Sequence, residues 1–143
     1  MSKNPFLGAW RLLSFEARTS RGEVSHPLGK DAVGVLLYGQ DGYMAGSLMR
    51  ADRANFKSAD MWAASPEEKL AAFDSYSSYC GTYEAKREKI IHHVKLSLFP
   101  NWGGRDQERY FEFAGDRLTL RTPPATVGGV ERTATLIWQR VTS

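Results

Sequence analysis

The sequence has little cysteine: Cys80 is the only one among 143 residues. A single cysteine cannot form an intrachain disulfide, which excludes a small secreted fold held together by disulfides. It also excludes zinc sites built from several cysteines. Histidine is scarce too, and His92 and His93 are adjacent on a predicted strand, so their side chains point to opposite faces. We therefore expect no metal site.

Clustered charge and long apolar runs are also missing. The 19 Lys and Arg residues against 16 Asp and Glu give a net charge of +3 without a run of five or six like charges, so we expect no nucleic-acid partner. No segment is long enough to cross a bilayer, and the N-terminus lacks the apolar stretch of a signal peptide. We expect a cytoplasmic protein without a membrane partner, and the sequence leaves a homodimer open.

What is present is a period-two pattern of apolar residues interrupted by Gly, Pro, Asp and Asn, which is typical of short antiparallel strands. The length fits a single domain, residues 1–143. Eight strands are predicted, at Leu7–Ala17, Val33–Tyr38, Tyr43–Arg50, Tyr79–Lys86, Ile90–Phe99, Gln107–Ala114, Arg117–Thr122 and Arg132–Val141. Eight sequential strands with short connections predict an all-β, antiparallel up-and-down barrel, whose interior can hold one small ligand.

One segment departs from the strand pattern. Ser65-Pro66-Glu67-Glu68 has the serine, proline and glutamate of a helix start, with the glutamate three residues after the cap. We predict one helix over Glu67–Tyr79, between the third and fourth predicted strands and covering one mouth of the barrel. The preceding segment, Ala51–Ala64, is the longest irregular stretch, which is typical of a functional lid.

Two features resemble a known family. Gly8-Ala9-Trp10 resembles the Gly-x-Trp signature at the start of lipocalins, and in those proteins an arginine of the last strand, here Arg140, packs across the tryptophan. Further segments are similar to the bacterial and fungal lipocalin-like domain family, whose barrels are of the calycin type. They are Leu37-Tyr38, Asp41-Gly42-Tyr43-Met44, Tyr79-Cys80-Gly81-Thr82-Tyr83, His92-His93-Val94, Leu98-Phe99-Pro100-Asn101-Trp102 and Leu118-Thr119-Leu120. The resemblance implies an eight-stranded lipocalin-like barrel and no single activity.

Alternation along the strands predicts which side chains face the interior. The inward set is mostly apolar, with a few polar members: Leu12, Tyr79, Tyr83, Ile90, His92, Val94, Leu96, Leu98, Arg109, Phe111, Phe113, Leu136 and Trp138. An inward Arg109 needs a partner, because an unpaired buried charge is costly. That partner is a ligand carboxylate, enolate or phenolate, or alternatively Glu16 or Glu84 in an internal ion pair. A position of Arg109 at the rim is a third alternative.

His92 and the two inward tyrosines also have two interpretations. His92 is either a general acid–base or a core histidine that bonds a tyrosine or a carbonyl. Tyr79 and Tyr83 present hydroxyls to a ligand or are aromatic core. Glycine pairs such as Gly103-Gly104 and Gly128-Gly129 lack the spacing of a phosphate-binding loop, and we expect no cofactor.

The leading hypothesis is binding of a small hydrophobic or aromatic metabolite that carries a polar or anionic group. Its candidate ligand-binding residues are Tyr38, Tyr79, Tyr83, His92, Asn101, Arg109, Phe111 and Trp138. The alternative is a cofactor-free isomerase, cyclase or dehydratase acting on a polyketide- or terpenoid-like substrate. In that case His92 is the acid–base, and Tyr83 and Arg109 stabilise an enolate-type oxyanion. A barrel filled by its own side chains, with no cavity, is the third hypothesis.

Overall fold

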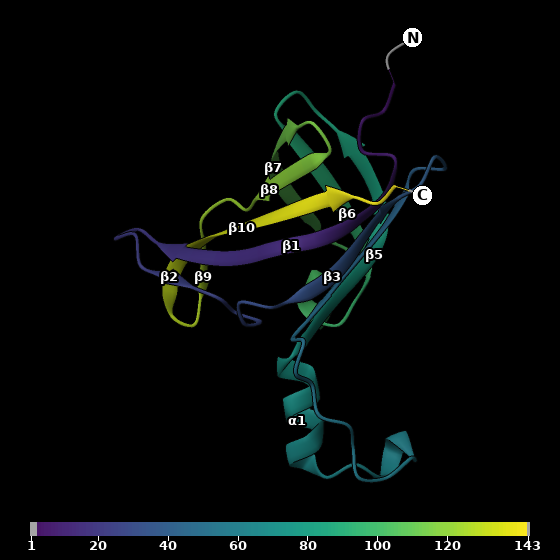
Figure 1. Cartoon of the computed structure of the whole chain (residues 1–143), viewed down its shortest axis with the longest axis vertical. Helices are drawn as coiled ribbons and strands as arrows, with labels where there is room; N and C mark the ends of the chain where they lie inside the picture. Colours follow the sequence, from purple (N-terminus) through teal and green to yellow (C-terminus); the bar gives the residue numbers. More distant parts are fainter. Residues whose placement is uncertain (1–2, 143) are drawn as a thin grey trace.

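The computed structural model describes residues 3–142 and closes eight antiparallel strands into a barrel (Figure 1). The barrel strands are β1 (Gly8–Thr19), β3 (Val33–Tyr38), β4 (Tyr43–Met49), β5 (Tyr76–Ala85), β6 (Lys89–Ser97), β7 (Asp106–Ala114), β8 (Arg117–Arg121) and β10 (Val130–Arg140). Each pairs with the next, and the pairing of β1 with β10 closes the ring. The predicted barrel is therefore confirmed.

Two short strands lengthen the barrel at one end, which we call the mouth. Strand β2 (Val24–Ser25) pairs with β1, and β9 (Ala125–Val127) pairs with β10. Two single-turn 3-10 helices, η1 (Met61–Ala63) and η2 (Pro100–Trp102), lie in the long connections at this end. The part of the chain that the structure describes contains no helix that is long and apolar enough to span a membrane.

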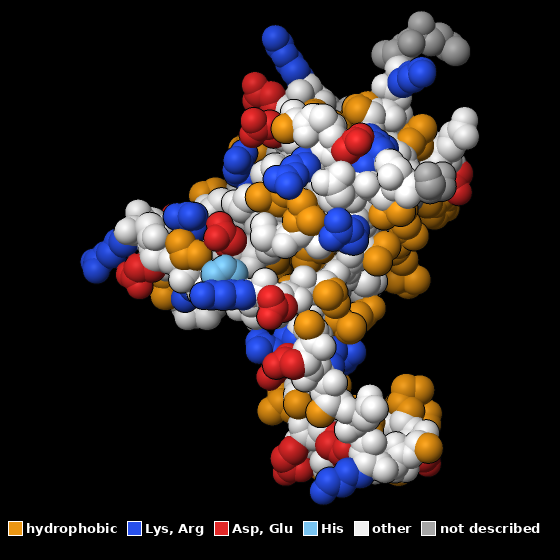
Figure 2. Space-filling model, viewed as in Figure 1, with side chains coloured by type: hydrophobic (Ala, Val, Ile, Leu, Met, Phe, Trp, Pro, Cys, Tyr) orange, Lys and Arg blue, Asp and Glu red, His pale blue; other side chains and the backbone are white. Residues whose placement is uncertain are grey.

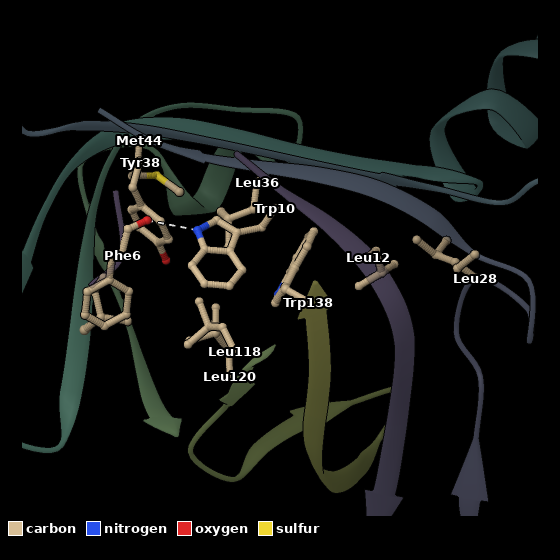
Figure 3. Packing of buried hydrophobic residues seen from close by; sticks show 12 residues of the cluster. Phe6, Trp10, Leu12, Leu28, Leu36, Tyr38, Met44, Leu118, Leu120 and Trp138 are labelled. Atoms are coloured by element: carbon tan, nitrogen blue, oxygen red, sulfur yellow. Dashed lines mark hydrogen bonds between the residues drawn. The ribbon is translucent and has the colours of Figure 1, made fainter. Parts of the chain in front are cut away.

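The opposite end, the base, is closed by aromatic packing around Trp10 (Figure 3). The Trp10 indole N–H donates to the carbonyl of Phe6 at 2.9 Å, and the Arg140 guanidinium lies 4.2 Å from the centre of the Trp10 ring. This is the tryptophan–arginine packing that the resemblance implied. The Phe6 ring packs edge-on against Phe111 and Phe113, with centroids 4.9 and 5.0 Å apart. Phe6 precedes the predicted first strand and was not expected in the core.

Helix α1 (Pro66–Asp74) begins as predicted and ends early. The Ser65 hydroxyl accepts from the Glu68 N–H, and the Glu68 carboxylate accepts from the Ser65 N–H, so the capping box forms. The predicted extension to Tyr79 is wrong. Strand β5 begins at Tyr76, because the backbone of residues 76–78 pairs with β4 and satisfies its hydrogen bonds there.

The predicted position of this helix over the barrel mouth is also wrong. Residues 50–75, which we call the arm, project away from the barrel with α1 and η1 (Figure 1). Leu70 is 62% exposed and Phe73 46%, so most of the apolar side of α1 faces solvent, and only the last turn of the helix borders the barrel cavity. Orange side chains are correspondingly visible on this part of the surface in Figure 2.

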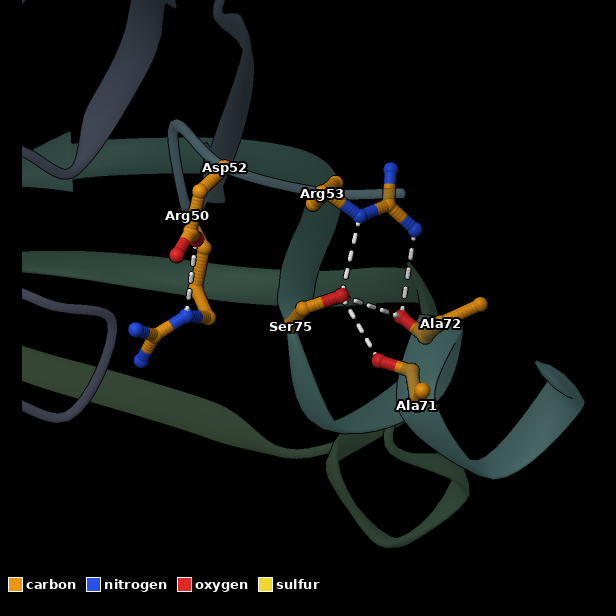
Figure 4. Close-up of polar contacts among 6 residues, drawn as sticks. All are labelled: Arg50, Asp52, Arg53, Ala71, Ala72 and Ser75. Carbon is orange, nitrogen blue, oxygen red and sulfur yellow. Dashed lines mark hydrogen bonds and ion pairs between the residues drawn. The ribbon is translucent and has the colours of Figure 1, made fainter. Parts of the chain in front are cut away.

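A small polar cluster lies within the arm, beside the start of β5 (Figure 4). Arg53 donates to the Ser75 hydroxyl at 2.9 Å and to the Ala72 carbonyl at 3.2 Å. The Ser75 hydroxyl donates in turn to the Ala71 carbonyl at 2.7 Å. These bonds satisfy carbonyls of the last helical turn, so they end α1 where β5 begins.

Strand β6 contains a further departure from the prediction. Ile90, His92 and Val94 are buried as expected, but Leu96 is 69% exposed and does not face the interior. The register between β5 and β6 shifts between Cys80 and Gly81, which reverses the alternation after Val94. The predicted inward orientation of Leu96 is therefore wrong.

Candidate ligand-binding site

The barrel contains a cavity of about 1020 Å³ that opens at the mouth. Most of its wall is apolar and comes from strands on all sides and from the loop before β3. The apolar lining includes Phe15, Leu28, Leu36, Met44, Leu48, Leu120, Leu136 and Trp138. This volume lies at the upper end of the range of small-molecule pockets, roughly 300–1,000 Å³. The hypothesis of a barrel filled by its own side chains does not hold for this structure.

Three aromatic polar residues form a hydrogen-bonded chain inside the barrel, which we call the Tyr–His–Tyr triad. The hydroxyl of Tyr38, from β3, lies 2.7 Å from Nε2 of His92, on β6. The hydroxyl of Tyr79, from β5, lies 2.6 Å from Nδ1 of the same ring. Tyr79 and His92 line the cavity, whereas Tyr38 is buried behind them and is not part of the wall.

Burial keeps the whole triad uncharged. It lowers the pKa of His92 to about 3, and the positive charges of Arg109 and His93 act in the same direction. Burial also raises the pKa of Tyr38 and of Tyr79, although Arg109 partly opposes both shifts. At neutral pH the imidazole is therefore uncharged. An efficient general acid has a pKa near the pH at which the enzyme works, and the pKa of His92 lies far below it.

Arg109, on β7, lines the cavity and lies close enough to influence all three residues of the triad. Its guanidinium donates to the Glu108 carbonyl at 2.8 Å and to the Gln107 side-chain oxygen at 3.2 Å. Within residues 3–142, no carboxylate pairs with it. The expected partners are engaged elsewhere: Glu16 pairs with Arg18 at 3.6 Å, and Glu84 pairs with Lys86 at 3.2 Å.

Of the alternatives for Arg109, the internal ion pair with Glu16 or Glu84 does not form. The cavity instead contains a cationic side chain whose contacts are two neutral oxygens of neighbouring residues. Such a group can donate hydrogen bonds to an anionic or carbonyl oxygen of a ligand. The described residues include no group of three or more His, Cys, Asp or Glu side chains that could hold a metal ion.

Three other predicted site residues lie outside the cavity wall. The Tyr83 hydroxyl donates to the Gly39 carbonyl at 2.8 Å and accepts from the Asn4 amide at 2.9 Å, so it stabilises the base. Phe111 packs on Phe6 in the base. Asn101 is exposed in η2. Tyr83 and Phe111 pack against the buried core of the base, so they do not line the cavity.

Comparison with known proteins now adds the family. The family model of the lipocalin-like domain matches residues 7–141. The chain belongs to this lipocalin-like domain family. It is also similar to the 4'-hydroxy-3'-methoxypropiophenone carrier protein ppsC of Aspergillus oryzae (strain ATCC 42149 / RIB 40). The two are 29% identical over 107 residues, which cover 68% of this chain and 96% of the carrier. No solved structure matches the chain significantly.

Several wall residues of this lipocalin-like domain were not anticipated from its sequence. Trp102, in η2, lines the cavity and packs edge-on against Tyr79 with the ring centroids 5.9 Å apart. Leu36 lines it from β3, a strand too apolar for its faces to be assigned by alternation. Phe73 reaches the wall from the end of α1. Residues in loops and at helix ends have no period that would indicate where they point.

Proposed function

We propose that this lipocalin-like domain binds a small aromatic molecule that carries a carbonyl or anionic oxygen. The observation that carries the proposal is the open apolar cavity of about 1020 Å³, with Tyr79, His92 and Arg109 in its wall. Apolar walls favour a hydrophobic ligand, and a few converging polar groups orient it. Arg109 supplies a positive charge that no carboxylate of the described chain neutralises.

The similarity to a carrier protein supports the aromatic part of the proposal. That relative is named as a carrier of 4'-hydroxy-3'-methoxypropiophenone, an aryl ketone with a phenolic hydroxyl. Such a molecule has the flat apolar body that the cavity wall accommodates. Its ketone and phenolate oxygens are acceptors that Arg109 and the Tyr79 hydroxyl can bind.

A carrier role is favoured over the cofactor-free enzyme by the state of the triad. Both nitrogens of His92 are within hydrogen-bonding distance of tyrosine hydroxyls, and burial holds the pKa of His92 at about 3. The Tyr83 hydroxyl, the other proposed catalytic donor, is bonded to the Gly39 carbonyl away from the cavity wall. The groups expected to exchange protons are thus engaged in holding the barrel together.

The proposal is tested by calorimetric titration with 4'-hydroxy-3'-methoxypropiophenone. We expect saturable one-to-one binding, accompanied by quenching of tryptophan fluorescence because Trp102 and Trp138 line the cavity. Arg109→Leu should weaken binding about tenfold or more, since a hydrogen bond to a charged group contributes about 1.5–3 kcal/mol. Arg117→Leu, an exposed arginine on the other face of the barrel wall, is the matched control and should bind as the wild type does.

Absence of saturable binding would overturn the proposal. An equal effect of Arg109→Leu and Arg117→Leu would show that Arg109 does not contact the ligand. Chromatography of the compound recovered after incubation checks the alternative, because an enzyme returns a changed molecule and a carrier returns it unchanged.

A further inference from the structure

The Tyr–His–Tyr triad has a direction. A neutral imidazole carries one N–H group and one bare nitrogen, so it donates one hydrogen bond and accepts one. Both nitrogens of His92 face a tyrosine hydroxyl, at 2.7 Å for Tyr38 and 2.6 Å for Tyr79. One tyrosine must therefore donate its proton to the ring, and the other must accept the ring proton.

The surroundings of Tyr38 decide which tyrosine donates. Tyr38 is 2% exposed and is not part of the cavity wall, and within residues 3–142 its hydroxyl has no hydrogen-bond partner besides Nε2 of His92. If Tyr38 accepted a proton from Nε2, its own hydroxyl proton would be buried without an acceptor, which folded proteins avoid. Tyr38 is therefore the donor, Nε2 is bare, and the ring proton is on Nδ1.

This assignment leaves the Tyr79 hydroxyl proton free. Nδ1–H of His92 donates to the Tyr79 oxygen, so the hydroxyl proton of Tyr79 cannot also point at the ring. Tyr79 lines the cavity, and among the described residues its hydroxyl has no hydrogen-bond partner besides Nδ1 of His92. We infer that Tyr38 and His92 fix the Tyr79 hydroxyl as a hydrogen-bond donor into the cavity, which selects ligands that present an acceptor oxygen such as a ketone carbonyl.

The rest of the polar wall agrees with this selectivity. Arg109, the other polar group beside the triad, has donors and no acceptor. Two of the acidic wall residues already have partners: Asp106 lies 2.7 Å from Nδ1 of His93, and Glu108 lies 3.5 Å from the Lys89 ammonium. The third, Asp74, is the last residue of α1 and does not belong to a barrel strand. The inner part of the cavity therefore presents donors to a ligand. Because burial keeps His92 neutral, this arrangement persists from pH 5 to 8.

The inference rests on the proposed function for its ligand, but its central claim is testable without one. Nitrogen-15 NMR of the free protein reports which ring nitrogen of His92 carries the proton, and the signals are assigned by their loss in His92→Gln. We expect the Nδ1–H form in the wild type. Tyr38→Phe removes the hydroxyl that donates to Nε2, and this hydroxyl is what favours the Nδ1–H form. In this variant the Nε2–H form should become populated. A wild-type protein with the proton on Nε2 would overturn the inference.

The selectivity is tested with a matched pair of probes, propiophenone and propylbenzene, which differ in the carbonyl oxygen. The wild type should prefer the ketone, and Tyr79→Phe should reduce that preference about tenfold while leaving the affinity for propylbenzene unchanged. Tyr38→Phe should also reduce the preference, although Tyr38 is not in the wall. Tyr43→Phe is the control, because the Tyr43 side chain on β4 is 55% exposed and does not line the cavity.

The outcomes separate the two proposals. If neither probe nor the substituted propiophenone binds, the proposed function fails, and the NMR measurement still decides the direction of the triad. If both probes bind and Tyr79→Phe keeps the full ketone preference, the binding function stands and the inference about Tyr79 is overturned.

Discussion

At the scale of single residues, Gly81 decides how β5 and β6 meet. A Cβ added at this position would lie 1.9 Å from the carbonyl oxygen of His93 and 3.0 Å from the backbone nitrogen of Lys95. Backbone atoms within a sheet cannot move aside without breaking the ladder. We expect Gly81→Ala to lower the free energy of unfolding by at least about 2 kcal/mol, as severe overpacking does, measured by urea denaturation.

The control for this prediction is Gly46→Ala. Gly46 is also a strand glycine, on the neighbouring β4, and its added Cβ would meet a flexible leucine methyl group of Leu36 at 3.4 Å. Gly46→Ala should therefore lower the free energy of unfolding much less than Gly81→Ala does. Equal losses of unfolding free energy in the two variants would show that the close backbone contact at Gly81 is not the cause of the destabilisation.

The same glycine explains why residue-level prediction succeeded only in part. Strand alternation placed Tyr79, His92 and Arg109 on the inner face, and the structure has all three in the cavity wall. It failed at Leu96, because the register shift beside Gly81 leaves no trace in a period-two pattern. The contact between Tyr38 and His92, 54 residues apart, was also beyond reach, since a sequence does not give distances between strands.

At the scale of elements, α1 is a helix whose stability is local. It projects from the barrel and exposes Leu70, so its start depends on the Ser65 cap more than on packing (Figure 1). Ser65→Ala should cost the helix about 1 kcal/mol. Hydrogen exchange of the amides of residues 69–74 should then rise about fivefold, while the urea midpoint of the barrel stays nearly unchanged.

Ser58→Ala provides the comparison within the same arm. The Ser58 hydroxyl accepts from the Asp60 N–H in a turn and caps no helix, so helix exchange should stay at the wild-type rate. A large shift of the barrel midpoint in Ser65→Ala would mean that the arm and barrel unfold together.

The start of this helix could be predicted from its sequence, and its end could not. The capping box is a local hydrogen-bond pattern, so Ser65 and Glu68 were enough to predict the start. The end depends on the pairing of Tyr76 with Met49 and on the bonds of Arg53 to Ser75, which are contacts between distant segments. Local propensity therefore gave a helix that was too long.

At the scale of the whole molecule, the closed ring of eight strands followed from alternation and short turns, because closure is what satisfies their edges. The packing of Phe6 that closes the base could not be predicted from the sequence, because Phe6 lies before the first segment with a period-two pattern. The result is a barrel with an aromatic base and an open mouth, and His92 lies between them. Its burial gives the stability of the entire fold a dependence on pH.

The pKa of His92 is about 3 in the barrel, against about 6.5 in an unfolded chain. Between these values the unfolded state binds more protons than the folded state, so stability rises with pH. The contribution is complete above pH 6.5 and falls by about 1.4 kcal/mol per pH unit below it. From pH 7.5 to pH 5.0 we expect His92 to lower the free energy of unfolding by about 2 kcal/mol, measured by urea denaturation at each pH.

His93 acts in the opposite direction, because its hydrogen bond to Asp106 raises its pKa and so favours the folded state at low pH. Its side chain is exposed, so solvent screens this opposing contribution. The comparison is therefore made in a His93→Asn background, where the loss of stability at pH 5.0 should be at least as large as in the wild type. Adding His92→Gln, which keeps a donor and an acceptor but does not titrate, should flatten the dependence over this range. An unchanged slope after that substitution would place the titrating group elsewhere and contradict a buried neutral His92.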